Sequence, residues 1–146
     1  MTQLEPEYQA IHEESEKMNE TRDCAVKAVA LACSVPYSTA HDELLWLGRV
    51  NRRTTPNYLI RQAIKNLGYK LEPFEHRAKT VRTLARELRH TAGTYLVWTP
   101  RHVLCIRGGK VLDWTKGRLN RINRVERVSL QVSESLCAAA SDLPKV

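Results

Sequence analysis

Apolar residues recur at helical spacing through most of the first ninety residues. We expect helices over residues 3–17, 24–33, 38–48, 56–67 and 81–89. In the second of these, Lys27 is the only polar residue among ten. A helix that is apolar nearly all round is usually buried, so we place this helix at the centre of the domain.

The pattern changes from helical to extended after Gly93. We expect strands over residues 69–74, 94–98, 102–107, 110–115 and 125–132. The pair Gly108-Gly109 separates two of these strands and predicts a two-residue hairpin turn. Helices that mostly precede antiparallel strands predict an α+β fold, with the helices packed on a small antiparallel sheet.

Helix ends and inward faces give further expectations. Thr21 or Asp23 is expected to cap the central helix, and Ser38 or Thr39 the helix after it. We expect core positions for four aromatic residues and one leucine, which are Tyr37, Trp46, Trp98, Trp114 and Leu45.

The composition fits one globular domain over residues 1–146, because 42% of the residues are hydrophobic and 27% are charged. Residues 1–18 are expected to form an acidic helix at its periphery, and residues 137–146 a loose tail. The chain has no run of 18 apolar residues and does not begin with a basic, then apolar leader. We therefore expect a cytoplasmic protein without a membrane partner.

Charge is distributed unevenly along the chain. Residues 1–23 hold seven acidic and two basic residues, although the whole chain carries a net charge of +7. Further along, basic residues recur at Lys116, Arg118, Arg121, Arg124 and Arg127. Such a series could bind phosphates or an acidic partner, or form a solvated edge. Because no aromatic residue interleaves it, nucleic acid is the less favoured partner.

Four cysteines are present, at positions 24, 33, 105 and 137. None belongs to a CxxC pair or has zinc-ligand spacing to a histidine, so we expect no metal and no cofactor. A small buried hydrophobe is the ordinary interpretation of each cysteine. Cys24 differs because it lies in the first helical turn, where the helix dipole and free N–H groups favour a thiolate.

The predicted hairpin brings a histidine and a carboxylate to one face of the sheet. With a two-residue glycine turn, Leu104 faces Asp113 and His102 faces Thr115. His102 and Asp113 are then diagonal neighbours, roughly 7–8 Å apart at Cα. A carboxylate at that place can hold the imidazole in one orientation, as the third member of a catalytic triad does.

Two segments carry a family resemblance. Residues 19–32 resemble the nucleophile helix of papain-like cysteine peptidases, closest to the compact bacteriocin-processing-peptidase-like domains of phage and bacterial proteins. Residues 93–114 resemble the histidine hairpin of the same family. The resemblance implies a papain-like fold, in which a helical half carries the nucleophile Cys24 and a sheet half carries His102 and Asp113. It also implies a peptide or protein substrate in the cleft between the halves.

The family commonly has a glutamine before the cysteine as an oxyanion donor, whereas the nearest amide here is Asn19. Two functions therefore stay open. The first is a cysteine peptidase or amidase that uses Cys24, His102, Asp113 and Asn19. The second is a catalytically idle papain-like protein that binds a host or partner protein, as a small phage effector would. A basic nucleic-acid-binding accessory protein is a third, less favoured interpretation.

Overall fold

The computed structural model describes residues 3–131 and has the α+β organisation that the pattern predicts. Its helices are α1 (Pro6–Lys17), α2 (Cys24–Ala32), α3 (Tyr37–Leu47), α4 (Asn57–Asn66) and α5 (Val81–Glu87). Its strands are β1 (Tyr69–Pro73), β2 (Thr94–Thr99), β3 (His102–Arg107), β4 (Lys110–Leu112) and β5 (Arg124–Leu130). The expected tail over residues 137–146, and with it Cys137, lies outside the described residues.

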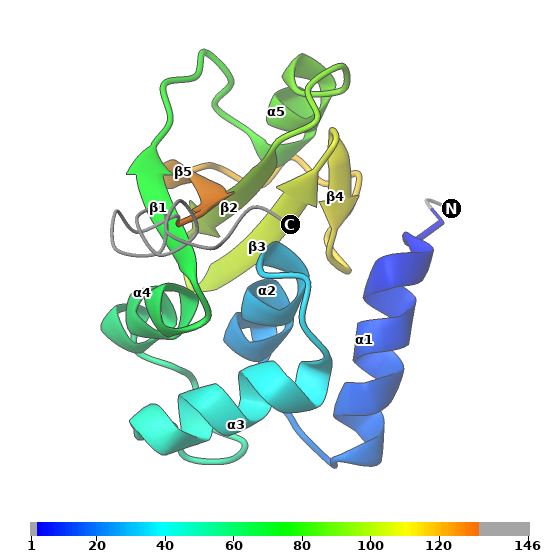
Figure 1. Ribbon diagram of the computed structural model, residues 1–146. Coiled ribbons are helices and arrows are strands. Elements are labelled where there is room, and N and C mark those ends of the chain that lie inside the picture. The colour runs from blue at the N-terminus through cyan, green and yellow to red at the C-terminus, as the bar shows by residue number, and fades with distance from the viewer. Residues whose placement is uncertain (1–2, 132–146) are drawn as a thin grey trace, which may run out of the picture.

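The strands form one antiparallel sheet in the order β1-β5-β2-β3-β4 (Figure 1). The predicted hairpin turn is confirmed, because Arg107 pairs with Lys110 across Gly108 and Gly109. Both glycines have positive φ angles, 57° and 77°, which a two-residue turn of this kind requires. A Cβ added to Gly109 would also clash with the backbone of Arg89, so the turn packs closely against the segment that follows α5.

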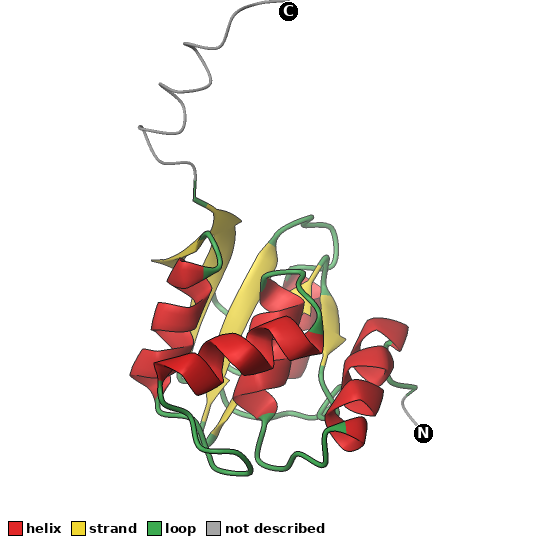
Figure 2. Cartoon of the chain, turned by 60° about the horizontal axis from the view of Figure 1, so that its bottom comes forward, coloured by secondary structure: helices red, strands yellow, loops and turns green. Residues whose placement is uncertain are grey.

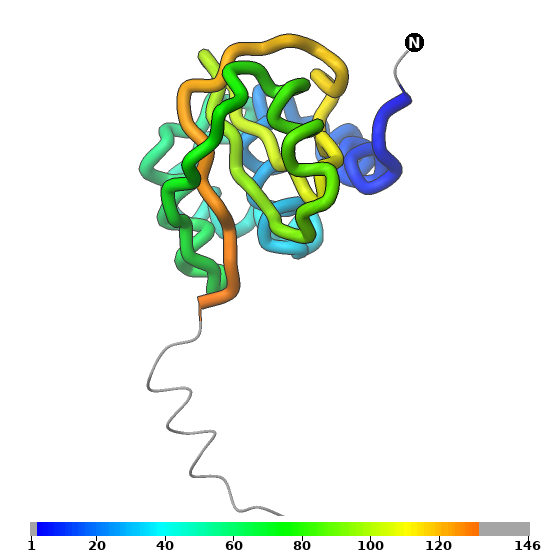
Figure 3. Tube along the Cα trace, turned by 90° about the horizontal axis from the view of Figure 1, so that it is seen from above, coloured from blue at the N-terminus to red at the C-terminus, as the bar shows by residue number. Residues whose placement is uncertain are grey.

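Helices cover both faces of the sheet. Alternate residues of β2 divide between two cores: Leu96 and Trp98 pack with α2 and α4, and Tyr95 and Val97 pack with α5. The first four helices therefore lie on one side of the sheet, and α5 lies on the other (Figures 2 and 3). A strand that is buried on both faces reads as a continuous apolar run, as residues 95–98 of β2 do.

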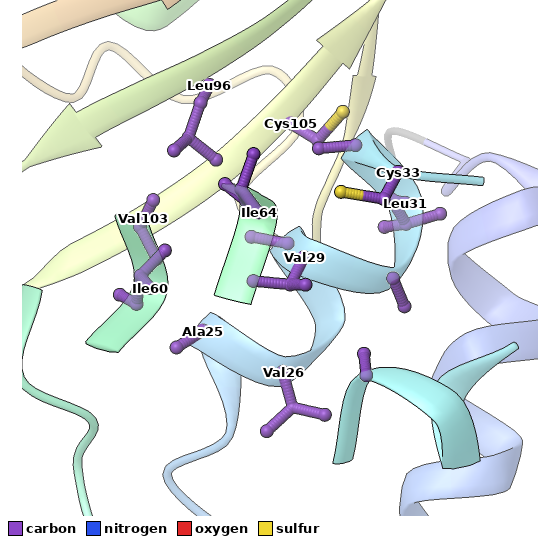
Figure 4. Close-up of a cluster of buried hydrophobic side chains, with 14 of the residues drawn as sticks. Ala25, Val26, Val29, Leu31, Cys33, Ile60, Ile64, Leu96, Val103 and Cys105 are labelled. Atoms are coloured by element: carbon purple, nitrogen blue, oxygen red, sulfur yellow. The ribbon is translucent and has the colours of Figure 1, made fainter. Parts of the chain in front are cut away.

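Helix α2 lies at the centre of the larger core, as its sequence predicts. Every residue from Ala25 to Ala32 is buried except Lys27, and side chains from α4, β2 and β3 surround it (Figure 4). Cys33 and Cys105 belong to this core, and burial raises the pKa of each of their thiols to about 12. These two cysteines are inert core residues.

Several local expectations are wrong. The N-cap of α3 is Pro36 rather than Ser38 or Thr39. Trp46 is 84% exposed and Leu45 is 45% exposed, because the helix turns the buried Leu44 toward the core instead. These two side chains follow Leu44 in sequence, and consecutive helical positions do not share a face.

The strand expected over residues 110–115 ends at Leu112, and a turn follows it. Trp114, in this turn, is 48% exposed and therefore lies outside the core. In the part of the chain that the structure describes, no helix has the length and apolar character needed to span a bilayer.

Candidate active site

Cys24 is the first residue of α2 and is half-buried, whereas most of the helix behind it is inaccessible. Asp23, the preceding residue, does not cap the helix with its side chain. Its carboxylate instead accepts hydrogen bonds from the hydroxyls of Ser15, at 2.5 Å, and Tyr37, at 2.7 Å. The N-terminus of α2 is therefore held from behind by a buried network, and no side-chain cap covers its N–H groups.

His102 opens β3, and its imidazole meets the carboxylate of Asp113. The Nε2 atom of His102 lies 2.7 Å from Oδ2 of Asp113, so the predicted cross-hairpin neighbours share a hydrogen bond. Asp113 is itself held by Thr115, which donates both its hydroxyl, at 2.5 Å, and its backbone N–H, at 3.3 Å. This turn fixes the carboxylate, and the carboxylate fixes the imidazole.

Cys24 lines the same two hollows as His102, and its side chain contributes to the raised pKa of the imidazole. Because Nε2 of His102 is bonded to Asp113, Nδ1 is the ring nitrogen left for a second partner. Burial opposes protonation of His102, but the hydrogen bonds and charges of Asp113 and Cys24 outweigh it and raise its pKa to about 9. The imidazole is therefore protonated at neutral pH, which is the form that stabilises a neighbouring thiolate.

Two adjoining hollows open beside this pair, and Cys24 and His102 line both. The first is walled by Arg22, Lys27, Asp113 and Trp114, among other residues. The second, about 580 Å³ in volume, extends past Thr54 and over Ile60, Trp98 and Val103. Cys24 and His102 therefore lie where the two hollows meet. We refer to the two hollows together as the cleft.

Two residues with unusual backbone conformation flank the pair. Arg22 comes two positions before Cys24 and has a φ angle of 51°, and Arg101 directly precedes His102 and has a φ angle of 61°. Positive φ is costly for residues other than glycine, and such strain concentrates at functional sites. Both arginines line the hollows that Cys24 and His102 line.

Asn19 is not brought to this site. It is an exposed residue with a φ angle of 54° beyond the end of α1, and it lines neither hollow. Its backbone carbonyl accepts a hydrogen bond from Arg52 Nε at 2.9 Å. The position that the resemblance assigns to an oxyanion donor therefore serves to anchor a loop in this chain.

The basic series of the sequence is divided among three places. Arg118 and Arg121 line a third hollow behind His102 and Trp114. Arg124 lines the second hollow, on the far side of the cleft. Arg127 is exposed on β5, opposite Glu72 of β1 and Tyr95 of β2. The four arginines do not form one continuous stripe.

Sequence reasoning missed several residues of the site. Trp114 stacks edge-on against His102, with ring centroids 5.9 Å apart, and Arg118 covers the same indole at 4.6 Å. The side chain of Lys27, in the first hollow, lies 3.6 Å from Asp23 and 3.0 Å from His12. The one available signal for Thr115 was its place two residues after Asp113, where hydroxyl side chains often cap a carboxylate turn.

Among residues 3–131, no three His, Cys, Asp or Glu side chains are grouped as metal ligands would be. Comparisons with protein-family models, with curated proteins and with solved structures give no match for this chain. The interpretation of the site therefore rests on its geometry and on the resemblance of its two segments.

Proposed function

We propose that this chain is a papain-like cysteine peptidase or amidase in which Cys24, His102 and Asp113 act as the triad. The observation that carries the proposal is the placement of His102, which is hydrogen-bonded to Asp113 through Nε2 and lines the same two hollows as Cys24. A nucleophile joined to a base, with the base oriented by a third group, is the arrangement that acyl transfer requires.

The chemistry would proceed in two steps. The Cys24 thiolate attacks the carbonyl carbon of an amide, and the protonated His102 gives its proton to the leaving amine as the C–N bond breaks. Water then attacks the thioester, His102 takes a proton from that water, and the acid leaves as the thiolate re-forms. The N–H groups at the start of α2 would bind the oxyanion, and the absence of a side-chain cap from Asp23 supports this role.

The test is cleavage of a peptide library derived from digested cell protein, followed by mass spectrometry. Wild-type protein and the Cys24→Ala variant are incubated with the same library. We expect new peptide ends that appear with wild type and not with Cys24→Ala. If the two digests are identical at every enzyme concentration, and Cys24 also fails to react preferentially with iodoacetamide, the enzymatic proposal is wrong.

The catalytically idle alternative keeps one supporting observation. Asn19 lies away from the cleft, so the family's second oxyanion donor has no counterpart at that position. Loss of one such donor typically lowers the rate by about 10²–10³-fold, which leaves a slow enzyme or none. A protein with a reactive Cys24 that binds peptides without cleaving them would favour this alternative.

A further inference from the structure

The second hollow has the composition of a binding pocket for one side chain. Its wall is apolar where Ile60, Trp98 and Val103 lie, and all three are at least 93% buried. Three arginines also line it, namely Arg61, Arg101 and Arg124. Among its lining residues, all of which belong to the described chain, there is no acidic residue.

The positive charge is held in place by one buried acid. Glu126, on β5, has only 2% of its side chain exposed. Its Oε2 atom accepts a hydrogen bond from Nη1 of Arg61 at 2.7 Å, and its Oε1 atom forms an ion pair with Nη2 at 2.7 Å. It also accepts the indole N–H of Trp98 at 2.8 Å, and Nε of Arg124 lies 3.6 Å away. The carboxylate of Glu126 therefore holds the side chains of Arg61, Arg124 and Trp98. Together with Arg101, three guanidinium groups line the hollow.

Arg101 is the third cation that lines the second hollow. It lies beside His102 with its backbone at positive φ, and it forms no ion pair within residues 3–131. Its exposed guanidinium has no carboxylate to bind in the described chain. An incoming carboxylate can supply that partner, and arginine–carboxylate hydrogen bonds are among the stronger ones in proteins.

On the proposed peptidase function, we infer that this pocket selects substrates with an acidic side chain next to the scissile bond. The methylene groups of a glutamate or aspartate would lie along Trp98 and Ile60, and its carboxylate would bind Arg101 and Arg124. Nucleic acid fits the pocket less well, because the arginines surround a single hollow instead of following a track along a strand.

The test uses peptidyl acyloxymethyl ketones, which alkylate a catalytic cysteine without requiring turnover. Pairs of tripeptide compounds differ by glutamate or glutamine at one position, and each of the three positions is varied in turn. At one position we expect the glutamate compound to alkylate Cys24 about tenfold faster, since binding of a charged group by arginine is the difference between the two. The double variant Arg101→Gln/Arg124→Gln should abolish this preference, so that the glutamate and glutamine compounds of that pair alkylate Cys24 at equal rates.

Arg82→Gln, an exposed arginine on α5 beyond the sheet, is the matched control and should keep the preference. If Cys24 reacts with iodoacetamide in a His102-dependent manner and all compound pairs react equally, the specificity inference is wrong and the proposed function stands. If Cys24 reacts with none of the reagents, both are wrong. If a random oligonucleotide at physiological salt protects Cys24 and no glutamate compound is preferred, the cleft binds phosphates and the inference is wrong.

Discussion

Two of the histidine–carboxylate pairs within residues 3–131 are largely shielded from solvent. His102 lies 2.7 Å from Asp113 at the cleft, and His41 lies 2.6 Å from Glu20 between α3 and the loop before α2. Arg49 binds Glu20 as well, at 2.9 Å, and all three side chains of that second cluster are at least 94% buried. The remaining nitrogen of His41, Nδ1, has no hydrogen-bond partner among the described residues.

The comparison shows that the pair alone does not make a site. His102 lines an open hollow together with Cys24, whereas the second ring nitrogen of His41 is buried without a partner among the described residues. Burial of Glu20 opposes its ionisation, but its hydrogen bonds to Arg49 and His41 outweigh burial and lower its pKa to about 2. We therefore interpret the His41 cluster as structural: it fixes the loop that leads to Cys24.

The largest effect should follow from removing the imidazole at the cleft. His102→Ala should reduce the rate of Cys24 alkylation by iodoacetamide at pH 6 by about 10²-fold or more, the usual contribution of a positioned base. His41→Ala should change the rate for the folded protein by less than about threefold, since it does not touch the sulfur. Alkylation quenched at a series of times, followed by peptide mapping, measures both rates. If the two variants lose equal reactivity at Cys24, the distinction between the two clusters is wrong.

The second prediction concerns stability, for which the buried cluster of Glu20, His41 and Arg49 should matter strongly. Glu20→Ala leaves Arg49 buried without its carboxylate, so the free energy of unfolding should fall by about 3 kcal/mol or more. The matched control is Glu16→Ala, which removes an exposed pair with His12 and should cost less than about 1 kcal/mol. Urea denaturation at pH 7 measures both values, and similar small losses would show that the cluster is not structural.

The third prediction separates the pairs by pH. The pKa of His102 is raised above its unfolded value, so its contribution to stability is complete below about pH 6.5 and is lost as the pH rises through about 9. The pKa of Glu20 is lowered, so its contribution is complete above about pH 4.5 and is lost as the pH falls toward about 2.

Denaturation of wild type, His102→Gln and Glu20→Gln across this range provides the measurement. The difference in the free energy of unfolding between wild type and His102→Gln should become smaller above pH 6.5. The corresponding difference between wild type and Glu20→Gln should become smaller below pH 4.5. Differences that stay constant with pH in both variants would contradict the assigned pKa directions.

The smallest predicted effect concerns Thr115, in the turn after β4. Thr115→Val removes one hydroxyl bond to Asp113 and keeps the backbone N–H, so stability should fall by about 1 kcal/mol. Alkylation of Cys24 should slow by a few fold because the carboxylate is less firmly held. Thr115→Ser should restore both properties, and a valine variant that matches wild type in both would remove Thr115 from the account.

The parts of the site that sequence reasoning could reach are those that local rules determine. A two-residue glycine turn sets the register of β3 and β4, which places His102 near Asp113. A helix with one polar residue in ten is predicted to be buried. Cys24 is its first residue and therefore lies at the end of a central element, where the cleft opens. The α+β class follows from the same periodicities.

The parts it could not reach depend on tertiary contacts. Asp23 is expected to cap α2 with its side chain, but Ser15 of α1 and Tyr37 of α3 donate hydrogen bonds to its carboxylate instead. Asn19 lies close to Cys24 in sequence, but a positive φ angle and Arg52 turn the chain before it reaches the cleft. Arg61 and Glu126 are 65 residues apart, and no sequence pattern connects them.

The interaction between Cys24 and His102 is tested most directly by titrating the His102 imidazole in isotope-labelled protein by NMR. In the wild type its midpoint should lie near pH 9, since both Asp113 and Cys24 stabilise the protonated ring. In Cys24→Ala the midpoint should move down, and Asp113 should still hold it above about 6.5. A midpoint near 6.5 in the wild type, or one that Cys24→Ala leaves unchanged, would contradict the proposed pair.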